Sequence, residues 1–134
     1  MAARNLIRQS FELAAERCED LTPFVYRRLF RDHPEAEALF RRDANDFIKG
    51  SMLALTIAAI LDFAGERTGS FRLIECEVTS HDAYGTPRDL FARFFSIIFE
   101  SLREITGSDW PPEFDTAWRE LLLELDDVVA RSEA

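Results

Sequence analysis

Residues 86–107 read TPRDLFARFFSIIFESLREITG, and this stretch determines the fold class. Its apolar side chains recur every three or four residues, which places them on one face of an α-helix. These side chains are Leu90, Phe91, Phe94, Phe95, Ile98, Leu102 and Ile105. Thr86-Pro87 is a typical helix start and Gly107 a typical helix end. The stretch therefore predicts one long amphipathic helix.

The rest of the chain carries further helix signals. Thr22-Pro23 predicts a helix start with Thr22 as the N-cap, and His33-Pro34 predicts a break, because proline cannot continue the backbone ladder. No segment alternates apolar and polar residues over a useful length, so the fold is predicted to be all-α, with one domain over residues 1–134. Helices are expected over about 3–18, 22–33, a short turn ending near Phe40, 46–64 before Gly65, 70–84, 87–106 and from 112 onward.

Composition excludes several classes of protein. The chain has 16 basic and 25 acidic residues, a formal charge of −9, so nucleic acid and anionic membranes are not expected as partners. The longest apolar run, Met52 to Leu61, is too short to span a bilayer. The first ten residues lack the apolar core of a signal peptide, and Cys18 and Cys76 are isolated thiols. A reduced, cytoplasmic protein is expected.

The chain has two histidines, His33 and His81. His33 precedes a proline and is predicted to be an exposed residue at a helix boundary. His81 is predicted in the last turn of a polar helix, where an imidazolium ion is favoured by the helix dipole. No Ser/His/Asp arrangement, phosphate-binding loop or zinc-ligand spacing offers other chemistry.

The order of motifs around these histidines gives a more specific interpretation. The motifs are Tyr26-Arg-Arg-Leu-Phe30; His33-Pro-Glu35 followed by Leu39-Phe40; Lys49-Gly50 followed by Leu53; His81-Asp-Ala-Tyr84-Gly85, which begins 32 residues after Lys49; and Trp110-Pro-Pro-Glu113 followed by Ala117-Trp118. Together they resemble single-domain bacterial globins, the type also found as the haem half of flavohaemoglobins. The resemblance runs from about residue 5 to about residue 130, and it implies a helical sandwich around a haem pocket.

The resemblance implies haem b, iron protoporphyrin IX, as the cofactor. His81 matches the proximal histidine, which ligates the iron, and Ser80 would orient its ring. Phe40 matches the phenylalanine that stacks on the porphyrin. Phe91 and Phe94 would line the pocket from the next-to-last helix, although plain core packing explains Phe94 equally well.

On the distal side, the resemblance matches Tyr26, Lys49 and Leu53 to positions over the iron. The Tyr26 hydroxyl would donate a hydrogen bond to bound O₂, and Leu53 would keep the site apolar. Lys49 stands where histidine or glutamine is usual. As an ammonium ion, its side chain would reach a haem propionate, hydrogen-bond the ligand or lie in solvent. As a neutral amine, it would ligate ferric iron.

Two further departures from the family bear on chemistry. Glu77 stands one turn before His81, where leucine is usual, and its carboxylate would give a peroxidase-like bias if it accepts a hydrogen bond from the imidazole. Alternatively, the charges of Glu77 and Lys49 indicate a globin fold that holds no haem. Phe91 replaces a tyrosine that supports the proximal histidine in flavohaemoglobin-like members.

The resemblance implies reversible binding of O₂, NO or CO for transport, scavenging or sensing. One alternative is an NO dioxygenase or peroxidase-type enzyme that uses an external reductase. Another is a signalling or packing module without haem. Ile97 and Leu123 are extra apolar residues on the last two helices that would suit either a homodimer face or the core.

Overall fold

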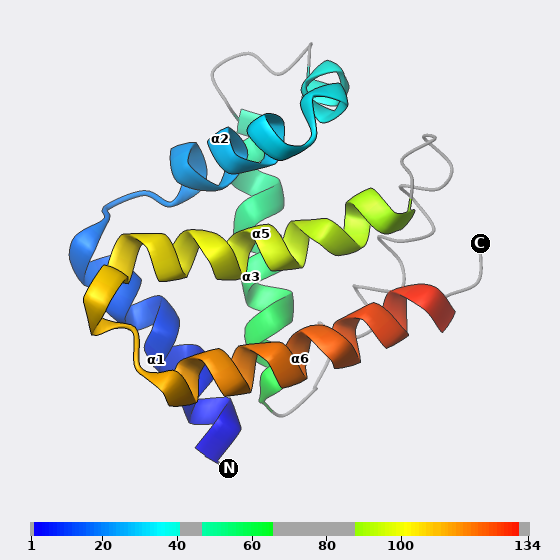
Figure 1. Ribbon diagram of the computed structural model, residues 1–134. Coiled ribbons are helices and arrows are strands. Elements are labelled where there is room, and N and C mark those ends of the chain that lie inside the picture. Colours follow the sequence, from blue (N-terminus) through cyan, green and yellow to red (C-terminus); the bar gives the residue numbers. More distant parts are fainter. Residues whose placement is uncertain (1, 41–46, 66–87, 132–134) are drawn as a thin grey trace.

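The computed structural model describes residues 2–40, 47–65 and 88–131, and the regular elements in these ranges are all helical (Figure 1). The prediction of an all-α protein is therefore confirmed for the described part of the chain. The elements are the α-helices α1 (Ala2–Arg17), α2 (Thr22–Asp32), α3 (Phe47–Ala64), α5 (Arg88–Thr106) and α6 (Pro112–Arg131), and the 3₁₀ helices η1 (Pro34–Phe40) and η3 (Gly107–Asp109).

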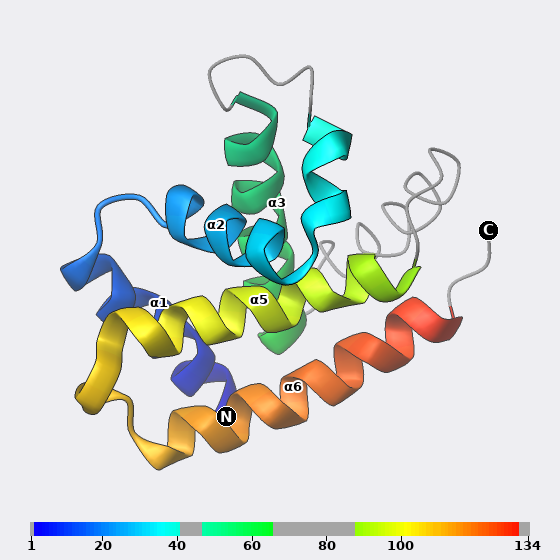
Figure 2. The same cartoon turned by 45° about the horizontal axis from the view of Figure 1, so that its top comes forward.

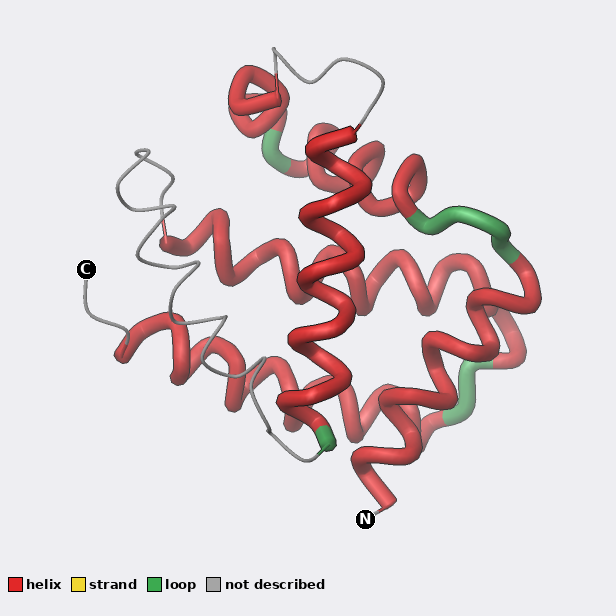
Figure 3. Tube along the Cα trace, turned by 180° about the vertical axis from the view of Figure 1, so that it is seen from behind, coloured by secondary structure: helices red, strands yellow, loops and turns green. Residues whose placement is uncertain are grey.

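The helices pack in two groups on either side of α5. Helix α6 lies alongside α5, and α1 packs against both of them. Helix α2 packs against the other side of α5 and is followed by η1, as Figure 2 shows. Helix α3 contacts α1 and α2, and seen from behind it runs across the direction of α5 and α6 (Figure 3). Helices α5 and α3 therefore each contact both groups.

Helix α5 follows the pattern that predicted it. It ends at Thr106, and Gly107 has a φ of 58°. This left-handed conformation is easily adopted only by glycine, which explains why the helix ends there. The predicted inner positions Phe95, Ile98 and Leu102 are buried in the core.

The start of α2 differs from the prediction. Thr22 is the first helical residue, and Leu21 occupies the N-cap position without a side-chain hydrogen bond. The Thr22 N–H donates instead to the carboxylate of Asp20, 3.0 Å away. The expected N-cap was wrong because an acidic side chain two residues upstream already accepts from the helix end. Pro23 lies in the first turn, as expected.

Helix α3 is apolar around most of its circumference, yet it is not enclosed on all sides. Leu53, Ile60 and Phe63 are buried, whereas Leu55 is 45% exposed. The sequence pattern alone does not distinguish these faces because both are apolar. Gly65 follows the last helical residue, as predicted. Within the described ranges, no helix is long and apolar enough to cross a membrane.

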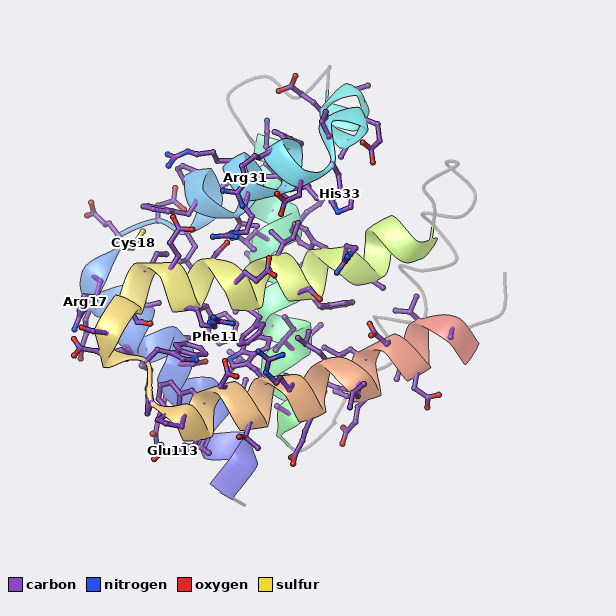
Figure 4. All side chains as sticks on the ribbon, in the orientation of Figure 1. Phe11, Arg17, Cys18, Arg31, His33 and Glu113 are labelled. Atoms are coloured by element: carbon purple, nitrogen blue, oxygen red, sulfur yellow. The ribbon has the colours of Figure 1, made fainter. Side chains whose placement is uncertain are left out.

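The centre of the α1–α5–α6 group is built on Trp118, which is fully buried. Its indole N–H donates to the Ser10 hydroxyl over 2.9 Å, and that hydroxyl donates to the Ile7 carbonyl over 2.6 Å. Phe99 stacks on Trp118 with ring centroids 5.7 Å apart. Figure 4 shows Phe11 pointing into the same region, and its ring meets Trp118 edge-on. The buried polar groups of this core thus satisfy one another.

The two residues considered for a homodimer face have different surroundings. Ile97 is only 2% exposed and belongs to the core, so it is not available for a dimer face. Leu123 is 71% exposed on α6. The spacing did not separate them because both lie on amphipathic helices with apolar residues near the edge of the inner face.

Candidate functional site

The candidate site centres on Tyr26, which the sequence of α2 directs inward. Tyr26 and Leu29, together with Val25, form the buried face of that helix. Tyr26 is 3% exposed. Its ring lies 5.9 Å from the ring of Phe30 and 5.6 Å from that of Phe94, both measured between centroids. Two neighbouring aromatic rings therefore limit its movement.

The hydroxyl of Tyr26 connects α2 to α3. It donates a hydrogen bond to the backbone carbonyl of Lys49, with 3.1 Å between the oxygen atoms. Lys49 lies in the first turn of α3, 23 residues away along the chain. Tyr26 thus contacts α5 through its ring and α3 through its hydroxyl, so two of the predicted distal positions meet here.

The third distal position, Leu53, lies one turn beyond Lys49 on α3 and is 3% exposed. Ile57, one turn further, is half-buried and packs against the same core. Phe94 on α5 is also half-buried. The described side chains Tyr26, Leu53, Ile57 and Phe94 are aromatic or aliphatic, and the Tyr26 hydroxyl is the polar group among them.

Ion pairs hold α2 onto α5 next to this group. Arg28 pairs with Glu104, and its guanidinium also lies 3.7 Å from the carboxylate of Glu100. Arg28 is only 17% exposed, so its charges are partly shielded from water. Because one guanidinium bridges two carboxylates on α5, the pairs form a network rather than an isolated surface contact.

His33 is placed differently from the prediction. It is half-buried rather than exposed, and its backbone N–H donates to the Leu29 carbonyl at the end of α2 (Figure 4). Its Nδ1 lies 3.5 Å from the Glu35 carboxylate in η1. After the break at Pro34, η1 packs against α2.

The other predicted site residues cannot be related to this group. Phe40 ends η1 and Phe91 lies in the first turn of α5, but their side chains are outside the described residues. His81, the predicted iron ligand, is also outside them, together with Ser80 and Glu77. The predicted helix over 70–84 falls in the same range, 66–87.

Sequence reasoning missed two contributors to the group. Ile57 follows Leu53 by four residues, so helical spacing on α3 was a usable signal for it. The Lys49 carbonyl had no signal, because every residue carries a carbonyl and side-chain patterns do not report on it. Lys49 thus contributes through its backbone, which none of the interpretations of its ammonium group included.

A metal site made of protein side chains alone is not evident in the described residues, which contain no group of three or more His, Cys, Asp or Glu residues suited to an ion. Comparison of the chain with protein-family models, with characterised proteins and with solved structures finds no match.

Proposed function

We propose that this protein is a globin that binds haem b and reversibly binds O₂, NO or CO. The observation that carries the proposal is that Tyr26 contacts both Lys49 and Phe94, through its hydroxyl and its ring respectively. These residues come from three helices, and the resemblance to globins assigned all of them to the haem pocket from sequence order alone.

The arrangement of the helices supports the same proposal. Globins pack their helices pairwise at steep angles around the haem pocket. Here α5 and α6 form one packed pair, α1 lies against both, and α3 runs across their direction (Figure 3). The candidate group lies where α2, α3 and α5 approach one another.

The aromatic and aliphatic surroundings of Tyr26 support haem as the cofactor in this proposal. A porphyrin is a flat apolar ring, and the described side chains near Tyr26 are aromatic or aliphatic. In the proposal, His81 would hold the iron, and Phe40 and Phe91 would line the pocket. Haem would supply the reversible binding of a diatomic gas. Leu53 and Phe94 would exclude water, and the Tyr26 hydroxyl would donate a hydrogen bond to a polar ligand.

A haemin titration followed by reduction and exposure to CO tests the proposal. We expect a sharp Soret band that saturates at one haem per chain and shifts when CO binds. A broad band that does not saturate, as for free haemin, would overturn the proposal.

The two histidines provide a matched pair of variants for this titration. His81→Ala should abolish saturable haem uptake, because the imidazole is the proposed iron ligand. His33→Ala removes the same side chain from the junction of α2 and η1, and it should leave uptake unchanged. Circular dichroism of both proteins without haem checks that each retains its helices. Equal uptake by the two variants would exclude His81 as the ligand.

A further inference from the structure

The hydrogen bond of the Tyr26 hydroxyl bears on how a ligand would be stabilised. A phenol has one proton to donate, and Tyr26 gives it to the Lys49 carbonyl. The same proton cannot at the same time be donated fully to a ligand. Stabilisation of a bound gas by Tyr26 therefore requires this bond to be weakened or broken.

When this bond breaks, the Lys49 carbonyl and the Tyr26 hydroxyl lose different shares of their hydrogen bonding. The Lys49 carbonyl lies in the first turn of α3, where the α-helical pattern pairs it with the N–H of Leu53. That carbonyl keeps an acceptor role within the helix after Tyr26 leaves. The Tyr26 hydroxyl is buried, and buried hydroxyls nearly always have a hydrogen-bond partner. A second acceptor nearby would therefore be able to take its proton at small cost.

The ring itself does not have to move far for this change. Phe30 and Phe94 pack against it from α2 and α5, so the ring is held in place. Rotation about the phenolic C–O bond redirects the proton while the ring stays packed. The contact between α2 and α5 would thus persist, and only the connection from α2 to the first turn of α3 would be released.

We infer that the Tyr26 hydroxyl alternates between two acceptors, the Lys49 carbonyl and a polar diatomic ligand, so that ligand binding releases the first turn of α3. The inference rests on the proposed haem function and adds a conformational response to it. O₂, which becomes polar when it is bound, draws the proton away from the carbonyl. CO is less polar and leaves most of the bond to Lys49 in place.

Hydrogen–deuterium exchange of the first two turns of α3 tests the inference, with α6 as the internal reference. The haem-loaded, reduced protein is compared without gas, under O₂ and under CO. O₂ should speed exchange in these turns roughly two- to tenfold, which is the range that the net loss of one hydrogen bond corresponds to. CO should change it little. Tyr26→Phe should show the faster exchange in all three states.

Thr56→Val is the matched control on the same helix. Its hydroxyl donates to the Met52 carbonyl over 2.7 Å, so this variant also removes a bond to a backbone carbonyl of α3 but leaves Tyr26 intact. It should keep the difference between O₂ and CO. Exchange that is independent of the gas in a protein that takes up haem would overturn the inference alone. Failure to take up haem would overturn the proposed function and the inference with it, and the absorption spectrum distinguishes the two cases.

Discussion

The two sides of α5 have similar apolar side chains but different polar groups at their centres. On the α1 and α6 side, Trp118, Leu102 and Leu125 are fully enclosed, and Ser10 satisfies the indole N–H. On the α2 and α3 side, Tyr26 and Leu53 are buried. Several of their apolar neighbours are only half-buried, namely Phe30, Ile57, Leu61 and Phe94. We call the cluster of Trp118, Leu102 and Leu125 the closed core. Half-buried apolar side chains border it too, namely Leu6, Phe11, Ile105, Trp110 and Leu122, so the two sides differ in the polar group at their centre, an indole with a serine on one and a phenol with a backbone carbonyl on the other.

This difference suggests a division of labour. A closed core contributes mainly to the stability of the fold, because its atoms already have well-packed partners. Half-buried aromatic and aliphatic side chains around one hydroxyl provide surface that an apolar ligand can cover. Substitutions on the two sides should therefore differ in which measurement they change.

The largest effect is expected from Leu102→Ala in the closed core. The side chain is fully buried, so its loss should lower the free energy of unfolding by about 2–5 kcal/mol. Chemical denaturation of the protein without haem measures this. Leu123→Ala is the matched control, since Leu123 is exposed, and it should change stability by no more than about 0.5 kcal/mol. Similar losses in both variants would contradict the assignment of Leu102 to a closed core.

A smaller loss of stability is expected from Phe94→Ala on the other side. Because the ring is only half-buried, about 1–3 kcal/mol should be lost, below the usual range for a fully buried phenylalanine. This variant should in addition weaken haem binding in the titration, since the Phe94 ring packs against Tyr26. Phe24→Ala removes a half-buried ring that lies under Arg27 on α2, and it should leave haem binding unchanged. Normal haem binding by Phe94→Ala would place Phe94 in the core alone.

The smallest loss of stability is expected from removing the negative charge of Asp115, on the helix that carries Trp118. A hydrogen bond from Arg119 lowers the pKa of the Asp115 carboxyl, with further help from Trp110 and Arg103. A lowered pKa in the folded state stabilises the protein above the unfolded pKa, and this contribution is lost as the pH falls through the folded pKa. Asp115→Asn should cost about 0.2–1 kcal/mol at pH 7.

The cost of Asp115→Asn should shrink as the pH falls below about 4, where the unfolded carboxyl becomes protonated. Thermal unfolding of the wild type and the variant across this range measures it. Glu113→Gln, in the exposed first turn of the same helix, controls for general loss of negative charge. A cost that does not change with pH would exclude the ionised carboxylate as its origin.

Much of the fold was predictable because the signals were local. Periodic apolar residues predicted α5, and the glycines at 65 and 107 marked helix ends that the structure retains. The burial of Ser10 was not predictable, since it depends on an indole N–H 108 residues away. The Asp20 acceptor before Thr22 was missed for a different reason, because two adjacent polar residues compete to accept from one helix end.

The central bond of the candidate site was not predictable from the sequence. The motif order that resembles globins singled out Tyr26 and Lys49, and the structure joins the Tyr26 hydroxyl to the Lys49 backbone carbonyl. Periodicity and motif spacing describe side chains, whereas this contact uses the backbone of one partner. The roles of His81, Phe40 and Phe91 remain predictions.

The bond between Trp118 and Ser10 has a consequence for how the chain is made. Synthesis proceeds from the N-terminus, so α1 leaves the ribosome long before the indole that donates to its serine has been made. Until α6 emerges, the inner face of α1, with Ile7, Phe11 and Ala14, lacks its final cover. A contact of such long range forms late and slows folding. Nascent chains that stall before Trp118 should therefore expose this apolar face and become targets for chaperones and proteases.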